Sequence, residues 1–243
     1  MLFALVIAGC SAAHSALPQV AEAGGTVTHY VLQNGGSPAN WRTFSPSGIG
    51  GFFTDVVVGP DKNLWFTDAQ TERIDRVSMT GATKVFAPSV VAGFIAVGAD
   101  KKFYLDDGED ALIGTMTTGG VTNRFSLPSG DQPSGLTLGP DNNIWFIEFR
   151  HVGKITKSGA ITEYTLPTPA LGDGTITTGP DGDLWFSEFT PSKIGKVTTS
   201  GQVTEYQIPG SPACNPRGIV KGPDGNLWFR CGSNIGRISN SPS

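Results

Sequence analysis

An eight-residue phrase recurs through this chain and constrains its fold more than any other feature. The phrase starts with Gly-Pro-Asp and ends in Trp-Phe, as in Gly222–Phe229. Further copies lie at Gly59–Phe66, Gly139–Phe146 and Gly179–Phe186, and a degenerate copy with Tyr in the Trp position lies at Gly98–Leu105. Successive copies begin about 40 residues apart, a period typical of solenoids and β-propellers.

Each repeat reads as four short strands. The Gly-Pro-Asp-Gly segment has the composition of a turn, because Pro presets φ and Gly tolerates the positions after it. The following Leu-Trp-Phe places large apolar groups on both faces of a strand, which suits a sheet covered on both sides. A second strand such as Ile194–Val197 and a polar strand such as Val203–Tyr206 come next, and an apolar run such as Gly218–Val220 precedes the phrase. Four strands in about 40 residues predict a propeller blade, so we expect an all-β propeller of five antiparallel blades.

The two ends of the repeat region complement each other. Thr26–Tyr30 has the pattern of an outermost strand but comes before the first repeat, whereas no such strand follows Ile235–Ile238. We therefore predict that the N-terminal strand completes the last blade and closes the ring, with the propeller at residues 26–239. Residues 34–50 would form a long loop that covers one mouth of the channel or crosses the surface.

The first residues suggest export. Residues 1–9 are apolar, and Ile7-Ala8-Gly9-Cys10 resembles the lipobox of bacterial lipoproteins, although no Lys or Arg precedes the apolar run. We expect an incomplete signal peptide at 1–9, lipidation at Cys10 and a flexible tether at 10–25; the alternative is a short disordered leader. On this interpretation the protein is in the bacterial periplasm or on the cell surface, and contacts the membrane only through its lipid.

The other two cysteines belong to the last repeat. Cys214 precedes its first strand and Cys231 ends its second, so a hairpin would bring them to the same rim. We predict a disulfide, which fits an oxidising compartment; the alternative is two unrelated buried thiols.

Nucleic acid is an improbable partner on charge. The chain carries a net charge of −4 and has no run of Lys or Arg. A nucleic-acid-binding domain needs a basic patch to neutralise phosphates.

The repeats resemble the virginiamycin B (streptogramin) lyase family. The resemblance rests on Gly-Pro-Asp-Gly-Asn-Leu-Trp-Phe, then Lys-Ile-Gly-Lys-Val, then Gly-x-Val-Thr-Glu-Tyr, and extends over residues 26–239. It implies a seven-bladed propeller, whereas this chain has repeats for five. It also implies a Mg²⁺ ion held by glutamates at the channel mouth, and histidines that bind the substrate and take a proton. The implied reaction is an elimination that opens the ester ring of a cyclic depsipeptide antibiotic.

Histidine is scarce at the positions where that reaction would need it. Of the three histidines, His14 lies in the tether, His29 on an outermost strand, and only His151 at the predicted rim. The residues five before each repeat glycine also face this rim, and none is His: Thr54, Gly93, Ser134, Gly174 and Arg217. A two-histidine site cannot be assembled from these positions, which speaks against the family's own reaction.

Acidic residues occupy one position of four repeats. Nine residues after the repeat glycine stand Asp68, Asp107, Glu148 and Glu188, followed by Cys231 in the fifth repeat. Equivalent positions of successive blades should lie around one rim, and Asp106 and Asp173 could join them. Such carboxylates suit Mg²⁺ or Ca²⁺. The alternative is that each acid only caps a strand end or faces water.

Three functions fit these observations. The first is a non-catalytic propeller that binds a small molecule, glycan or protein at the acidic rim, with Arg217 and Asp173 as ligand contacts. The second is a metal-dependent C–O lyase with His151 as the base and Glu148 and Glu188 near the cation. The third is a lactonase-like hydrolase with a rim-bound cation. Fold resemblance alone does not choose among them.

Overall fold

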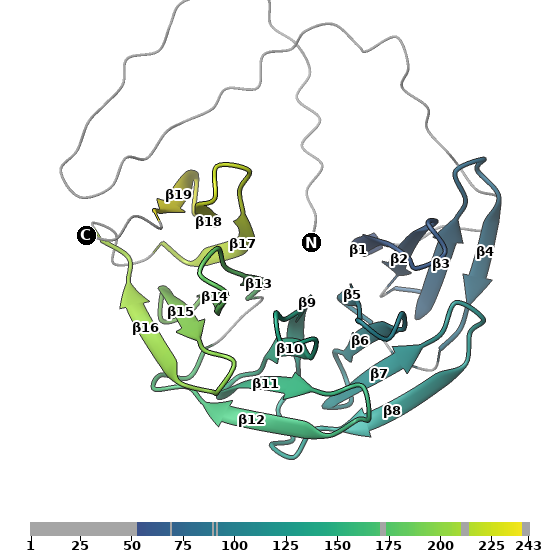
Figure 1. Ribbon diagram of the computed structural model, residues 1–243, viewed down its shortest axis with the longest axis horizontal. Coiled ribbons are helices and arrows are strands. Elements are labelled where there is room, and N and C mark those ends of the chain that lie inside the picture. The colour runs from purple at the N-terminus through teal and green to yellow at the C-terminus, as the bar shows by residue number, and fades with distance from the viewer. Residues whose placement is uncertain are drawn as a thin grey trace, which may run out of the picture.

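The computed structural model describes residues 53–68, 70–88, 90, 92–170, 174–209 and 214–239. These residues form an all-β propeller of five antiparallel sheets that follow one another around a common centre (Figure 1). The first sheet is β1 (Phe53–Val58), β2 (Leu64–Asp68), β3 (Arg73–Val77) and β4 (Thr83–Phe86). The second is β5 (Ile95–Val97), β6 (Phe103–Asp107), β7 (Leu112–Met116) and β8 (Thr122–Ser126).

The remaining sheets repeat this meander. The third is β9 (Ser134–Leu138), β10 (Ile144–Ile147), β11 (His151–Ile155) and β12 (Ile161–Thr165). The fourth is β13 (Ile176–Thr178), β14 (Leu184–Glu188), β15 (Lys193–Val197) and β16 (Val203–Gln207). The fifth is β17 (Pro216–Lys221), β18 (Leu227–Cys231) and β19 (Asn234–Ile238). We call these sheets blades 1 to 5; the predicted five-bladed all-β propeller is confirmed.

The repeated phrase forms a turn whose Asp side chain is hydrogen-bonded to the start of the next strand. In blade 1, Oδ1 of Asp61 accepts a hydrogen bond from the indole Nε1 of Trp65 at 2.8 Å and one from the amide of Asn63. A Cβ atom at Gly59 would lie 2.4 Å from the indole ring, so only glycine fits there. The same Asp–Trp hydrogen bond recurs in blades 3, 4 and 5. The phrase is thus a packing motif, as its sequence predicts.

The core lies between successive blades. The ring of Trp65 in blade 1 is fully buried, with its centroid 4.4 Å from that of Phe103 in blade 2. Three further apolar clusters join blade 2 to 3, blade 3 to 4 and blade 4 to 5. Burying an aromatic side chain of this size stabilises the fold by roughly 2–3 kcal/mol, so each blade depends on its neighbour.

Several predictions concern residues outside the described part of the chain. These are the signal peptide, the tether with Cys10, the loop at 34–50 and the closing strand at 26–32. Figure 1 shows the five blades along an arc, with blades 1 and 5 at its two ends. Within the described residues, none of the elements is an apolar helix long enough to cross a membrane.

Candidate ligand site at one rim of the propeller

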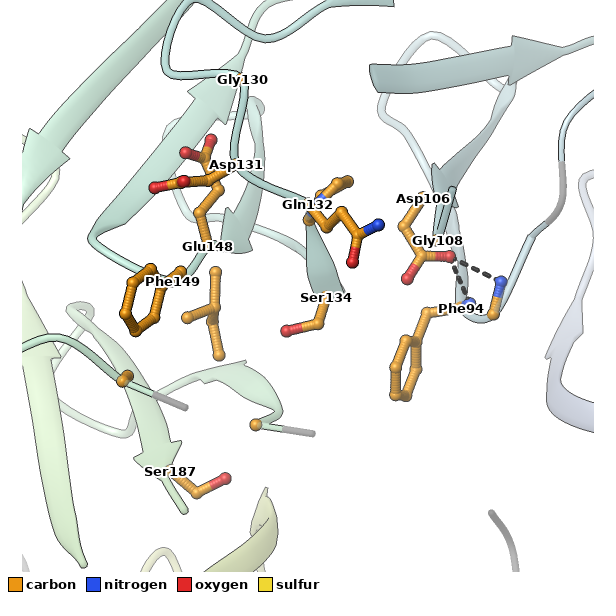
Figure 2. Close-up of a pocket in the computed structure, with 15 residues that line it drawn as sticks. Phe94, Asp106, Gly108, Gly130, Asp131, Gln132, Ser134, Glu148, Phe149 and Ser187 are labelled. Atoms are coloured by element: carbon orange, nitrogen blue, oxygen red, sulfur yellow. Dashed lines mark hydrogen bonds between the residues drawn. The ribbon is translucent and has the colours of Figure 1, made fainter. Parts of the chain in front are cut away.

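A cavity of about 680 Å³ opens at one rim, among blades 2, 3 and 4 (Figure 2). Its floor is formed where the first strands of these blades begin, at Gly93, Ser134 and Gly174. These are three of the five positions that the repeat spacing placed at the rim. At Gly174 a Cβ atom would lie 2.4 Å from the backbone oxygen of Ser187, so the backbones of two strands meet closely there. The cavity therefore lies at positions that could be identified from the spacing of the repeats.

One wall of the cavity carries Asp106, which ends β6 together with Asp107. Asp106 is buried, and its Oδ1 accepts hydrogen bonds from the backbone amides of Gly93 at 2.8 Å and Phe94 at 2.5 Å. Burial raises the pKa of Asp106 to about 7, and the negative charge of Asp55 adds to this rise. Figure 2 shows Gln132 and Ser134 between this wall and the wall with Glu148.

The opposite wall carries Glu148 at the end of β10. Its side chain is buried, and Oε2 accepts a hydrogen bond from Oγ of Ser129 at 2.6 Å. Among the described residues, Oε1 of Glu148 has no hydrogen-bond partner. Burial raises the pKa of Glu148 to about 8, and the nearby carboxylates of Glu163 and Asp131 raise it further.

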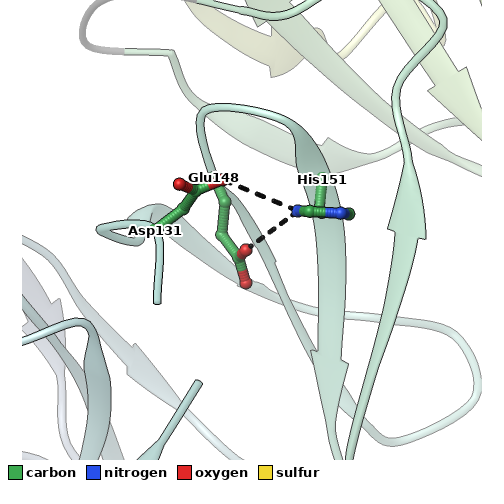
Figure 3. A group of neighbouring side chains, drawn as sticks. All are labelled: Asp131, Glu148 and His151. Carbon is green, nitrogen blue, oxygen red and sulfur yellow. Dashed lines mark ion pairs between the residues drawn. The ribbon is translucent and has the colours of Figure 1, made fainter. Parts of the chain in front are cut away.

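His151 is the first residue of β11 and is close to Glu148. Its Nδ1 atom is 3.5 Å from Oε2 of Glu148 and 3.7 Å from Oδ2 of Asp131 (Figure 3). The ligand atoms of Asp131, Glu148 and His151 all lie within 4.8 Å of one another. Asp131 and Glu148 line the cavity, whereas His151 is not among its lining residues.

Blade 4 contains the counterpart of this cluster with a lysine in it. Lys193 starts β15 as His151 starts β11, and each pairs with the last residue of the fourth strand of its blade. Nζ of Lys193 lies 2.5 Å from Oε2 of Glu205 and donates a hydrogen bond to Oγ1 of Thr168 at 2.8 Å. Glu188, the counterpart of Glu148, is fully buried in the same place. His151 thus stands where blade 4 has a lysine.

We compared the sequence with profiles of known protein families. A profile of the virginiamycin B lyase family matches residues 52–242. This chain belongs to the virginiamycin B lyase family. The family resemblance predicted from the repeats is therefore confirmed.

Individual relatives are longer than this chain. The virginiamycin B lyase of Nocardia farcinica (strain IFM 10152) is 29% identical over 110 residues, which are 44% of this chain and 39% of that protein. A catalytically inactive His-to-Ala variant of the virginiamycin B lyase from Staphylococcus aureus, solved with quinupristin, is 32% identical with a TM-score of 0.69. That match covers 75% of this chain and 64% of the solved one. This chain spans less than two thirds of either relative's length.

More distant structures share only the fold. A gluconolactonase from Xanthomonas campestris superposes with a TM-score of 0.58 at 13% identity, covering 77% of this chain and 71% of that one. At this identity the likeness extends to the propeller architecture and not to the site.

The four carboxylates that share one repeat position do not gather at one point. Oδ1 of Asp68 accepts hydrogen bonds from the amides of Gln70 and Thr71, and Asp107 accepts the corresponding pair in blade 2. These two aspartates therefore cap the turns that follow their own strands. A position that occurs once per blade is spread around the rim, so no three of Asp68, Asp107, Glu148 and Glu188 form a group of metal-ligand spacing.

Arg217 and the two cysteines of blade 5 are not among the residues that line the cavity. The guanidinium of Arg217 lies over the ring of Phe189, 4.3 Å from its centroid. Asp173 is outside the described residues, so its role stays a prediction. Cys214 and Cys231 form a disulfide, with Cα atoms 4.9 Å apart.

Sequence reasoning missed Asp131 and Ser129. Both lie in the connection from β8 to β9, which has no repeated phrase. Aligning the connections of successive blades would have set Asp131 against Ala170, and Ser129 against Thr168. That comparison identifies Asp131 as an acidic residue at the position where the next connection has Ala170, counted from the Leu-Pro pair that both connections share.

Proposed function

We propose that this chain is a ligand-binding propeller that holds a small molecule in the rim cavity without carrying out the family's elimination reaction. The observation that supports this most is the composition of the cavity walls. Carboxyl groups of Asp106 and Glu148 face a volume of about 680 Å³ together with the rings of Phe94 and Phe149. Cavities of this size that combine apolar surface with a few polar groups are typical of small-molecule sites.

The wall chemistry favours a peptide-like ligand. Carboxyl oxygens and the Gln132 amide can pair with amide groups of a ligand, and the two phenylalanine rings can pack on its apolar or aromatic parts. Cyclic peptides and depsipeptides combine these features. The Staphylococcus aureus relative was solved with quinupristin, which supports a streptogramin-like molecule as the first ligand to test.

The position of His151 argues against catalysis. An elimination needs a base that reaches the Cα–H of the substrate, after which the Cβ–O bond breaks and a carboxylate leaves. His151 does not line the cavity and occupies the place of the structural Lys193, with Glu148 nearer to the cavity. His151 is the one histidine among the described residues. Among the described residues, the cavity therefore has carboxyl groups in its wall but no histidine in contact with it.

A metal-dependent lyase is the second candidate, favoured by family membership and by the Asp131–Glu148–His151 cluster. These three residues fit a cation, because buried atoms of Glu148 and His151 lack hydrogen-bond partners in the described structure. A bound cation would supply stabilisation of negative charge on the ester carbonyl. A metal-bound imidazole cannot also take a proton, so in this alternative Asp131 and Glu148 would hold the cation and His151 would be the base. The lactonase-like alternative has support from the fold only.

Titration calorimetry with a streptogramin B tests the first proposal. We expect saturable binding that weakens roughly tenfold in Asp106→Asn and in Glu148→Gln, the size expected for one lost hydrogen bond. Glu109→Gln, which changes an exposed acid in blade 2, is the matched control and should bind like the parent. Unchanged affinity in both cavity variants would contradict the proposed site.

Chromatography of the same antibiotic after incubation with protein and Mg²⁺ separates the two candidates. We expect the ring to stay closed. Ring-opening by the parent that is lost in His151→Ala would establish the lyase in place of the binding protein.

A further inference from the structure

We propose that Asp131, Glu148 and His151 bind one divalent transition-metal ion, such as Zn²⁺ or Mn²⁺, in place of the lysine ammonium that blade 4 carries. Figure 3 shows the three side chains pointing toward one another from the β8–β9 connection, the end of β10 and the start of β11. Their ligand atoms lie within 4.8 Å of one another, a spacing that one ion can bridge. The site belongs to the wall of the cavity described above, but it does not depend on which small molecule the cavity takes.

Two atoms of the cluster are buried without partners. Oε1 of Glu148 and Nδ1 of His151 make no hydrogen bond to any described residue, and the Glu148 side chain is 0% exposed. Nδ1 lies 3.5 and 3.7 Å from the two carboxylates and forms a hydrogen bond with neither. Leaving a buried carboxylate and an imidazole nitrogen unsatisfied is costly, and a shared cation would satisfy both.

Blade 4 shows what normally occupies this place. There the ammonium of Lys193 lies between Glu205 and Thr168, and the residue matching Asp131 is Ala170. At these two positions blade 3 therefore has an imidazole in place of an ammonium and a carboxylate in place of a methyl group. Each of the two differences makes the surroundings of Glu148 less positive.

In blade 3, Arg150 does not take the place of the ammonium that Lys193 provides in blade 4. Arg150 approaches Asp131, with Nε 3.4 Å from Oδ2, but its side chain is 58% exposed. An exposed ion pair of this kind contributes about 0–1 kcal/mol and leaves Glu148 without a counter-charge. Arg150 therefore stabilises one edge of the cluster and leaves its buried centre for another cation.

The two carboxylates and one imidazole of this cluster indicate which metal ions it would bind. Mg²⁺ and Ca²⁺ prefer ligand sets made of oxygen atoms, whereas an imidazole with carboxylates suits Zn²⁺ and related transition metals. Three protein ligands leave further coordination positions free. Because Asp131 and Glu148 also line the cavity, a bound ion would lie beside the space where the small molecule is expected.

Calorimetric titration of chelator-treated protein with Zn²⁺ or Mn²⁺ tests the site. We expect one equivalent to bind and the melting temperature to rise with ion concentration, because the ion binds the folded state. Two variants copy residues from blade 4: His151→Lys reproduces Lys193, and Asp131→Ala reproduces Ala170. Each should abolish saturable binding without lowering the melting temperature of the metal-free protein.

Two additional variants serve as controls. Asp110→Asn, an exposed acid of blade 2, should leave metal binding unchanged. If His151→Lys does not fold, His151→Gln provides the same test with a neutral side chain. Metal binding that persists in the His151 and Asp131 variants, or no binding by the parent, would overturn the proposal. Both readouts use the metal alone, so a failure to bind streptogramin leaves this result intact.

Discussion

Lys193 forms an ion pair with Glu205 on the neighbouring strand β16, with Nζ 2.5 Å from Oε2. Both side chains are largely buried, and the fully buried Glu188 lies beside them with no hydrogen-bond partner for either oxygen among the described residues. Burial raises the pKa of Glu188 to about 8, the charge of Glu205 raises it further, and the charge of Lys193 opposes the rise. The ammonium therefore supports two buried acids at once.

Replacing this lysine should destabilise the protein strongly. Lys193→Met leaves Glu205 buried without its cation, and we expect the free energy of unfolding to fall by about 3–5 kcal/mol in urea titrations. Lys102→Met removes the more exposed pair with Asp100 and should cost less than about 1 kcal/mol. Equal, small losses in the two variants would contradict a structural role for Lys193.

The protonation of Asp106 should make stability depend on pH. Its pKa is about 7 in the folded protein and near 3.8 when unperturbed, so the folded state binds the proton more tightly. The resulting stabilisation is present below pH 4 and is lost as pH rises to 7 and above. Asp106→Asn can keep the oxygen that accepts from Gly93 and Phe94 without the charge.

Urea unfolding of parent and Asp106→Asn across this range measures the effect. We expect the variant to be the more stable protein above pH 7, by an amount on the order of 4 kcal/mol at most, and the difference to shrink toward pH 4. Asp55, whose pKa burial also raises, is the acid whose charge acts on Asp106 and should add to the same slope in both proteins. Parallel stability curves would show that Asp106 does not titrate in this range.

The disulfide between Cys214 and Cys231 should stabilise blade 5. It closes a loop with a sequence separation of 17 residues, which in the chain-entropy model contributes roughly 3 kcal/mol. Melting curves of the parent with and without reductant, and of the double variant Cys214→Ser/Cys231→Ser, measure this contribution. Two free thiols found by alkylation and mass spectrometry of unreduced protein would exclude the bridge.

We propose that residues 26–32 pair with β19 as the fourth strand of blade 5. The described part of that sheet has three strands, whereas blades 1 to 4 have four each. An unpaired edge strand exposes backbone groups and promotes association with other chains. Deleting residues 26–32 should cause aggregation or a lower melting temperature, while deleting residues 11–17 in the tether should do neither. A deletion variant that melts like the parent would contradict this pairing.

We also propose that Cys10 carries a lipid, given the lipobox-like residues before it. In a bacterial host, Cys10→Ser should move the protein from the membrane fraction to the soluble fraction. The unchanged propeller domain predicts equal melting temperatures for the two forms. Identical fractionation of parent and variant would refute the anchor.

The sequence by itself determined the architecture and the family. The reason is that the repeated phrase satisfies its own requirements over a few residues: Asp61 bonds the indole four residues later, and Gly59 leaves room for that ring. Such local constraints can be recognised in a sequence without knowledge of distant partners. The spacing of the phrases also placed Gly93, Ser134 and Gly174 at the rim, where the cavity lies.

Only the tertiary structure decided what the rim acids do. Asp107 and Glu148 share one repeat position, but the shorter side chain reaches the amides of its own turn, whereas the longer one extends to Ser129 on the connection from the preceding blade. The burial of Glu148 and its contact with Asp131 depend on that connection, in which Asp131 lies outside the Leu-Pro-Ser segment that resembles the next connection. A sequence period identifies equivalent positions; the contacts that distinguish them come from non-repeated segments packed beside them.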